Sequence, residues 1–273
     1  MILFPNAKIN LGLNILRKRP DGYHDIDTVM YPVPWCDILE IVPSKGVETT
    51  LTVTGRGVAC PPEKNLVMKA YRAVADRMPI PPVDIYLHKV IPDGAGLGGG
   101  SSDASFTIRG LNELFALGMT DDDMAAIAAS IGADCPFFIY NRPMRATGIG
   151  TDFADIAIKL SGHYIAIVKP ADSIPTARAY AGVSPALPEE DIAGILAQEI
   201  SRWQGHLAND FETSVFEGYP TIKGIKERLT ALGATYASMS GSGSAVYGIF
   251  DNDNLSETLK REFPDCDIFT GRL

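Results

Sequence analysis

Pro92-Asp93-Gly94-Ala95-Gly96-Leu97-Gly98-Gly99-Gly100-Ser101-Ser102-Asp103-Ala104 is the stretch of sequence that decides the fold. Five of its residues are glycines, and they lie between an expected strand and an expected helix. Glycine lacks a Cβ, so such a loop can adopt left-handed dihedrals and bring its N–H groups close to a ligand. The helix that follows leaves its first N–H groups unpaired and carries a positive partial charge at that end. The stretch therefore predicts a phosphate-binding loop.

Three familiar types of glycine loop fit this stretch less well. A P-loop requires a lysine after its last glycine, and Ser101 stands there. The dinucleotide pattern G-x-G-x-x-G does match, but the acidic residues about 20 positions later look like a helix start instead of a strand end. A protein kinase would also need Val-Ala-Ile-Lys and His-Arg-Asp, and neither occurs. The remaining option is a glycine-serine loop that opens a long helix.

Composition limits the class of protein. The 273 residues fit one large domain or two modest ones, and 46% apolar with 21% charged residues is typical of a globular protein. The formal net charge of −9 disfavours nucleic-acid binding, which relies on basic patches. The four cysteines are scattered and predict reduced thiols, not a zinc site or a disulfide framework. Without a signal peptide or an apolar run long enough for a membrane span, we expect a cytoplasmic protein.

Hydrophobic periodicity predicts strands mixed with helices throughout, which favours an α+β protein in two layers. The expected strands are 8–16, 37–42, 49–54, 83–90, 163–168, 235–239, 244–250 and 266–270. The expected helices are 65–78, one capped by Ser101 or Ser102 and running to about Phe115, 121–131, 189–199, 209–217, 221–232 and 254–262. Residues 136–147 read as short strands or loop. We place the domain boundary between residues 1–158 and residues 159–273.

Several further blocks accompany the glycine loop in a fixed order over nearly the whole chain. They are Pro5–Leu11, Arg19–Ile26, Gly132–Phe138, Ser173–Thr176, Asn209–Glu212 and Ser240–Ala245. The loop resembles the central motif of the GHMP small-molecule kinases. The block Asp21-Gly22-Tyr23-His24 is more specific, and it resembles the 4-diphosphocytidyl-2-C-methyl-D-erythritol kinases within that family. The resemblance implies a two-domain fold, with an N-terminal nucleotide-binding α/β domain and a C-terminal ferredoxin-like α/β domain.

The resemblance also implies ATP and Mg²⁺ as cofactors. ATP would be bound by the glycine loop, Pro92 to Ser102, with Lys89, Asn65 and Asn112 on the adenine and ribose side. Ser102 and Asp103 could help to hold Mg²⁺, a hard ion that prefers oxygen ligands. Asp103 has an equally good alternative interpretation, in which it stabilises the dipole of the helix from its first turn.

Asp134 and Lys8 are the predicted catalytic residues. The resemblance places Asp134 beside the acceptor hydroxyl, where it would accept the proton late in phosphoryl transfer. From the local sequence alone, Asp134 would instead merely end the helix before Pro136. Lys8 lies in an otherwise apolar strand, which favours a functional role, and the resemblance places it by Asp134 and the acceptor oxygen. Asn10 lies two residues further along the same strand, so it points to the same side and could bind the acceptor.

The resemblance assigns the cytidine end of the substrate to aromatic residues. Tyr23 and His24 would select the base, and Tyr180 would be the second stacking wall. His24 could instead be a turn histidine, and Tyr180 could be ordinary partial burial. The remaining substrate-side residues are Thr176, Gly241 and Gly243, although 240–243 alone reads as a tight hairpin turn.

The function expected from the resemblance is ATP-dependent phosphorylation of the 2-hydroxyl of a cytidine-diphosphate-linked methylerythritol, in non-mevalonate isoprenoid synthesis. A second hypothesis is a GHMP kinase for homoserine, mevalonate or a sugar, which leaves the Asp-Gly-Tyr-His block unexplained. A third is a non-catalytic nucleotide-binding regulator. For all three we expect a small-molecule ligand, no nucleic acid, no membrane and no obligate protein partner.

Overall fold

The computed structural model describes residues 1–58 and 60–273, and they form two compact units. Unit 1 contains Met1–Ala7, Trp35–Asp93 and Gly98–Arg142; unit 2 contains Lys8–Pro34, Gly94–Leu97 and Pro143–Leu273. This division does not coincide with the expected boundary between 158 and 159. The physical reason is one sheet of unit 2, because all four of its strands come from residues before that boundary.

Unit 1 contains a four-stranded sheet in the order β1-β4-β6-β5. Its strands are β1 (Ile2–Leu3), β4 (Ile38–Pro43), β6 (Val83–Lys89) and β5 (Thr50–Gly55). Strands β5 and β6 are parallel, and the other neighbours are antiparallel. In β6, Val83, Ile85 and Leu87 are buried while the residues between them are less so, which is the alternation expected of a sheet with one covered face.

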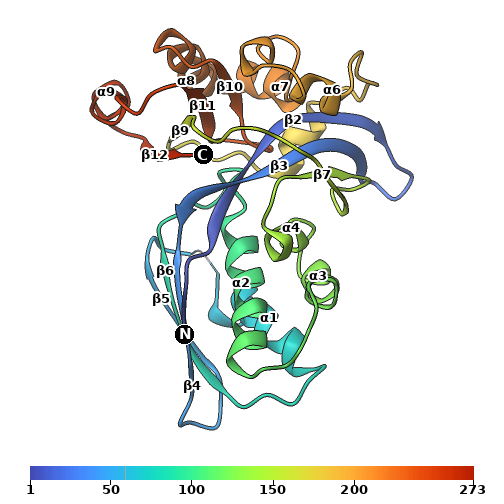
Figure 1. The fold of residues 1–273 in the computed structure, drawn as a ribbon, viewed down its shortest axis with the longest axis vertical. Coiled ribbons are helices and arrows are strands. Elements are labelled where there is room, and N and C mark those ends of the chain that lie inside the picture. Colours follow the sequence, from blue (N-terminus) through green and yellow to red (C-terminus); the bar gives the residue numbers. More distant parts are fainter. Residues whose placement is uncertain (59) are drawn as a thin grey trace. The chain divides into compact units, whose positions relative to one another are not determined.

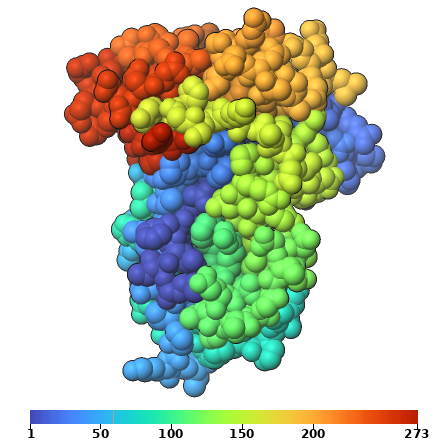
Figure 2. Space-filling view, viewed as in Figure 1, coloured from blue at the N-terminus to red at the C-terminus, as the bar shows by residue number. Residues whose placement is uncertain are grey.

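Helices accompany this sheet in the described part of unit 1. They are α1 (Leu66–Ala75), α2 (Gly99–Leu114), α3 (Asp121–Ala129) and α4 (Cys135–Tyr140), and the 3-10 turn η1 (Pro62–Lys64) precedes α1. Figure 1 shows α1 and α2 side by side against the sheet, with α3 and α4 next to α2. The turn after β4 protrudes from the unit, as the light-blue residues of Figure 2 show, and Val47 within it is 94% exposed.

Unit 2 contains an antiparallel sheet in the order β10-β11-β9-β12. The strands are β10 (Tyr236–Met239), β11 (Val246–Phe250), β9 (Tyr164–Lys169) and β12 (Asp267–Arg272). Helix α8 (Pro220–Ala231) packs on β10 and β11, α7 (Phe211–Gly218) packs on α8, and α9 (Ser256–Glu262) contacts β12. The core between them is apolar and fully buried at Val246, Ile222 and Leu229.

A second sheet of unit 2 has the order β2-β3-β7-β8. Its strands are β2 (Asn6–Lys18), β3 (His24–Cys36), β7 (Met144–Thr147) and β8 (Asp152–Asp155). The unit also contains α5 (Thr176–Ala181), α6 (Ile192–Leu196) and the 3-10 turn η2 (Ile200–Arg202). Within the described residues, no helix has the length and apolar character that crossing a bilayer requires.

The expected strands and helices are confirmed in place, with shifted ends, and several features differ. Residues 135–140 form helix α4, because a proline is tolerated in the first turn of a helix. Strands β1, β3 and β8 and helix α5 lie outside the expected elements. Helix α2 begins at Gly99 and is capped by Gly98 in the left-handed region, so neither Ser101 nor Ser102 caps it.

Candidate active site

The glycine loop adopts the backbone conformation that its composition predicts. Gly94, Gly96 and Gly98 have φ angles of 61°, 74° and 71°, which L side chains rarely adopt. The first intrahelical bond of α2 runs from the Ser102 N–H to the Gly98 carbonyl, at 2.9 Å. The N–H groups of the three residues before Ser102 therefore have no acceptor inside the helix. This helix start can bind an anion such as a phosphate.

The first half of the loop, Gly94–Leu97, is held by hydrogen bonds within unit 2. The Ala245 N–H donates to Ala95 O at 3.1 Å, the Ser240 hydroxyl to Gly96 O at 2.8 Å, and the Lys8 N–H to Leu97 O at 2.9 Å. A Cβ added to Gly96 would lie 2.0 Å from Ser240 O, so only glycine fits there. Ahead of these residues, Pro92 is buried and Asp93 is exposed. The loop thus presents its backbone because both its dihedrals and its packing exclude side chains.

A buried ion-pair cluster in unit 1 connects the residues before and after the loop. The Lys89 ammonium donates to Asp37 Oδ2 at 2.5 Å and to Asp103 Oδ2 at 2.7 Å, and the three side chains are at most 3% exposed. Asp37 Oδ1 accepts the N–H groups of Val90 at 2.5 Å and Ile91 at 2.8 Å. The cluster therefore joins the end of β6, where the loop begins, to α2, where it ends.

This cluster corrects the interpretation of Asp103 as a first-turn residue. Asp103 lies in the second turn of α2, and its partner is Lys89 instead of the helix dipole. Burial raises the pKa of Asp103 well above its usual range, and Asp37 adds to the rise while Lys89 opposes it. Burial alone would lower the pKa of Lys89, but the carboxylates of Asp103 and Asp37 raise it overall. Lys89 therefore stays charged, which also gives this predicted nucleotide contact an internal structural role.

Two buried oxygen atoms near the start of α2 bear on the expected Mg²⁺. Ser102 Oγ and Asp103 Oδ1 are buried side-chain atoms to which no described residue gives a hydrogen bond. Mg²⁺ prefers oxygen ligands, so the Ser102 hydroxyl fits the ion. Asp103 fits less well, because the ammonium of Lys89 on its other oxygen would repel a cation.

The two asparagines predicted on the nucleotide side have different places in unit 1. Asn65 is the N-cap of α1, and its side chain accepts the Val67 N–H at 2.9 Å. Asn112 lies ten residues beyond Ser102, about 15 Å along the helix axis. Its amide bonds both the N–H and the carbonyl of Met119, at 3.0 and 3.1 Å, and so holds the turn after α2. The structure does not bring Asn112 to the glycine loop.

Asp134 stands directly before α4, as the residue that flanks its first turn. It is half-buried, and its side chain makes no capping hydrogen bond to the helix. The next residue is fixed instead by Ser105 of α2, whose hydroxyl donates to Cys135 O at 2.6 Å. The structural alternative, in which Asp134 merely ends a helix, therefore finds no support: α3 ends earlier, at Ala129, and α4 begins after Asp134.

Lys8 and Asn10 point to one side of β2, as their spacing predicts. The Lys8 ammonium donates to Asn10 Oδ1 at 2.6 Å, and Asn10 Nδ2 donates to the Thr28 hydroxyl at 3.0 Å. Lys8 and Asn10 are each 3% exposed. A Cβ added to Gly241 would lie 3.3 Å from Asn10 Oδ1, so the turn 240–243 approaches this pair. The structure therefore groups Lys8, Asn10 and Gly241 within unit 2, with Gly96 beside them.

The predicted base-binding residues also lie together in unit 2. The rings of His24 and Tyr180 are stacked, with centroids 4.9 Å apart and planes at 22°, and Tyr180 meets Phe211 edge-to-face at 4.9 Å. Tyr23 is 62% exposed, and Thr176 is an exposed residue at the start of α5. The His24 and Tyr180 rings cover each other, and the space between them is too narrow for a base, so the structure does not show Tyr180 as a separate second wall opposite His24.

Comparisons with known proteins agree with this geometry. The domain described as "GHMP kinases N terminal domain" matches residues 65–142, and "GHMP kinases C terminal" matches residues 192–266. A "4-diphosphocytidyl-2-C-methyl-D-erythritol kinase" of Parabacteroides distasonis is 49% identical over 100% of both chains. The chain belongs to the GHMP kinase family. It therefore has the two-domain α+β GHMP kinase fold and is a kinase that uses ATP.

Solved structures of GHMP kinases extend the comparison. A crystal structure of a 4-(cytidine 5'-diphospho)-2C-methyl-D-erythritol kinase has a TM-score of 0.80 and 31% identity, covering 99% of this chain and 98% of the other. Homoserine kinase from Cytophaga hutchinsonii has a TM-score of 0.73 over 98% of this chain and 94% of its own. At 17% identity, the second match shows the fold alone.

Supporting residues of this GHMP kinase were missed because their roles depend on distant partners. Asn209 Nδ2 donates to the carbonyls of Met239 and Gly241, both at 2.8 Å, and so shapes the turn beside Asn10. Glu212 Oε1 accepts the Met239 N–H at 2.8 Å and the Ser238 hydroxyl at 3.0 Å. The block Asn209–Glu212 is one of the blocks that carry the resemblance, but its local sequence does not indicate which strand it supports.

Proposed function

We propose that this GHMP kinase transfers the γ-phosphoryl group of ATP to the 2-hydroxyl of 4-diphosphocytidyl-2-C-methyl-D-erythritol, a step of non-mevalonate isoprenoid synthesis. The observation that carries the proposal is the 49% identity over the full length to the relative of that name. The stacked pair of His24 and Tyr180 supports it, because an aromatic surface suits a pyrimidine base. A cytoplasmic location and the lack of an obligate protein partner stay predictions from the sequence.

The glycine loop would bind the phosphates of ATP through backbone N–H groups. Phosphoryl transfer requires positioned reactants and positive charge near the transferred group, with little covalent work from the protein. The free N–H groups at the start of α2 supply part of that charge without a conformational change. Bound Mg²⁺ would neutralise charge on the β- and γ-phosphates, and Ser102 is the residue we assign to it.

We assign the proton of the acceptor hydroxyl to Asp134. A carboxylate is too weak a base to remove the proton of an alcohol before reaction. It can accept that proton late, when the hydroxyl oxygen is already bonding to phosphorus. Lys8 would stabilise negative charge on the acceptor oxygen and the γ-phosphate, and its hydrogen bond to Asn10 holds the ammonium in place.

We assign selection of the base to His24 together with Tyr180. Substitution of His24 by Ala is expected to raise KM for the acceptor about tenfold, because base stacking on an aromatic ring contributes about 1–3 kcal/mol. The value of kcat should stay close to wild type, since the ring does not touch the reacting atoms. Steady-state kinetics at saturating ATP measure both. His163→Ala is a matched control, because His163 lies in the same unit and pairs with Asp251. A fall in kcat with KM unchanged would contradict the recognition role.

The proposed function is tested by ADP release in a coupled assay with MgATP. We expect turnover with 4-diphosphocytidyl-2-C-methyl-D-erythritol and none with the phosphate that lacks cytidine, or with homoserine or mevalonate. Equal turnover with the cytidine-free phosphate would support kinase activity but reject recognition of the base. Turnover only with homoserine or mevalonate would show that the acceptor differs from the one proposed. No ADP release with any of these compounds would favour a nucleotide-binding regulator.

A further inference from the structure

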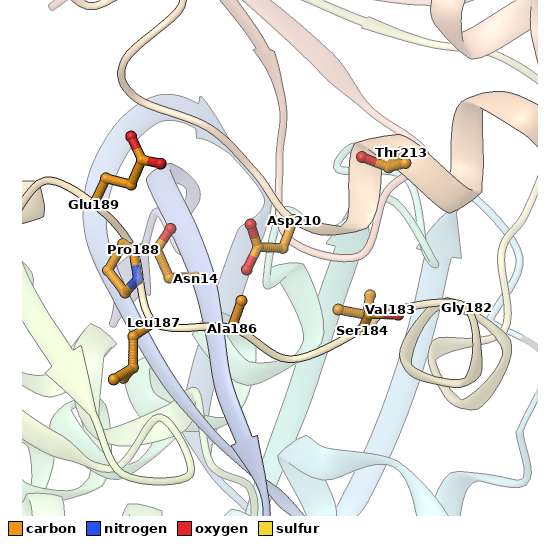
Figure 3. Close-up of a pocket in the computed structure, with 10 residues that line it drawn as sticks. All are labelled: Asn14, Gly182, Val183, Ser184, Ala186, Leu187, Pro188, Glu189, Asp210 and Thr213. Carbon is orange, nitrogen blue, oxygen red and sulfur yellow. The ribbon is translucent and has the colours of Figure 1, made fainter.

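A pocket lies entirely within unit 2, and none of the residues that line it has an assigned role in the proposed reaction. Its volume is about 400 Å³, in the range of small-molecule sites. Figure 3 shows its three walls, formed by β2 with Asn14, the start of α7 with Asp210 and Thr213, and the segment Gly182–Glu189. The segment is attached to β2 by the Ala186 N–H, which donates to Ile15 O at 3.0 Å.

Asn14 is the residue that indicates a ligand. It is only 8% exposed, and no described residue forms a hydrogen bond with its side-chain amide. The amide atoms are not among the fully buried atoms that lack a partner, so they open on the pocket and are available to a ligand. In Figure 3 the Asn14 side chain and the Asp210 carboxylate face each other across the pocket. A ligand between them can form hydrogen bonds with both.

The charges of the lining residues indicate the charge of the ligand. The side chains that line it include two carboxylates, Asp210 and Glu189, and no basic residue. Asp210 is half-buried and uses Oδ2 to accept the Ile15 N–H at 2.6 Å, which leaves Oδ1 for a ligand. Burial raises the pKa of Asp210, as expected for a carboxylate with too few partners.

The remaining lining residues favour an organic ligand over a metal ion. Thr213 and Ser184 add hydroxyl groups, while Val183, Leu187 and Pro188 add an apolar strip. In residues 1–58 and 60–273, no group of three or more His, Cys, Asp or Glu side chains is arranged to hold a metal. A charged head between the carboxylates, with a short aliphatic stem on the apolar strip, matches both parts of the lining.

We propose that this pocket binds a small organic cation, a primary ammonium or guanidinium group on an aliphatic stem. Its head donates hydrogen bonds to Asp210 Oδ1 and Asn14 Oδ1, and Glu189 adds a solvent-exposed charge. Two sources share this chemistry, a free amine and the arginine or lysine side chain of another protein. The site does not depend on the identity of the kinase's acceptor.

The test is calorimetric titration of the full chain with agmatine and putrescine, and with 1,4-butanediol as a neutral analogue of putrescine. We expect both cations to bind in the millimolar range or tighter and the diol to show no binding. Asp210→Asn keeps an acceptor for the Ile15 N–H, and it should weaken binding about tenfold, as loss of a charged hydrogen-bond partner does. Glu189→Gln should weaken binding only two- to threefold, about the effect of an exposed charge.

Asn14→Leu separates a ligand contact from a general charge effect. It should also weaken agmatine binding about tenfold, since the head group loses one of its two hydrogen-bond acceptors. Glu190→Gln is the matched control, because Glu190 is an exposed acid next to the pocket whose partner is His206. It should bind agmatine as wild type does, and thermal unfolding of each variant checks that it folds.

Titration with N-acetyl-arginine amide distinguishes the two sources. If N-acetyl-arginine amide binds more tightly than agmatine, the pocket is assigned to a protein side chain. If it binds more weakly, the pocket is assigned to a free amine. Both results support a cation site. Equal binding of 1,4-butanediol, equal binding to Asp210→Asn and wild type, or no binding of any of the cations at tens of millimolar would overturn the proposal.

Discussion

Asp134→Asn is expected to lower kcat by about two to four orders of magnitude, the usual contribution of a positioned general base. The affinity for MgATP should stay close to wild type, because the glycine loop supplies its own N–H donors. The fold should also persist, since asparagine has nearly the shape and volume of aspartate. Turnover and nucleotide affinity are measured separately, by the coupled assay and by titration with a non-hydrolysable ATP analogue.

Asp121→Asn is the matched control for this variant. Asp121 is an exposed carboxylate in the first turn of α3, so its loss should leave both kcat and nucleotide binding unchanged. Near-normal turnover of Asp134→Asn would reject the assignment of the base. Loss of MgATP binding would instead place Asp134 in the nucleotide site.

The glycine loop was predictable because its signal is local. Glycine adopts left-handed dihedrals that other residues avoid, and the structure shows Gly94, Gly96 and Gly98 at positive φ. Alternation placed Lys8 and Asn10 on one side of a strand for the same reason, and their hydrogen bond confirms it. The loop conformation and the shared side of Lys8 and Asn10 both depend only on residues that are close in the sequence, so the sequence was enough to predict them.

Two local features misled because proline and serine have more than one role. The segment 136–147 predicts short strands or a loop, yet Pro136 lies in the first turn of α4. Ser101 and Ser102 are good capping residues, but Gly98 already holds the left-handed conformation that ends the loop, so the helix begins before them.

The supporting residues of the site could not be predicted, because their partners are far apart in the chain. Lys89 and Asp37 are separated by 52 positions, and Asn209 and Gly241 by 32. Lys89 alone would be interpreted as a polar surface residue. Only the packing of β6, α2 and the start of β4 reveals that Lys89 lies between two buried carboxylates.

Lys89→Met is expected to destabilise the protein by about 3–5 kcal/mol, the usual cost of leaving buried charge unpaired. The Lys89 ammonium separates Asp37 and Asp103, both at most 3% exposed, and methionine of similar length would leave these two carboxylates without a cation. Urea unfolding followed by circular dichroism measures the loss. Lys69→Met is the matched control, since Lys69 is exposed on α1, and it should change the stability by less than about 0.5 kcal/mol.

A double variant separates the structural role of Lys89 from contact with the nucleotide. Asp103→Asn removes one of the two carboxylates at nearly constant shape, so Lys89→Met/Asp103→Asn should recover a substantial part of the lost stability, a coupling typical of residues in direct contact. A lysine that only touched ATP would behave differently. Its replacement would raise KM for ATP while the free energy of unfolding stayed at the wild-type value, and Asp103→Asn would restore nothing. A single variant with unchanged stability would therefore reject the buried cluster as the element that fixes both ends of the glycine loop.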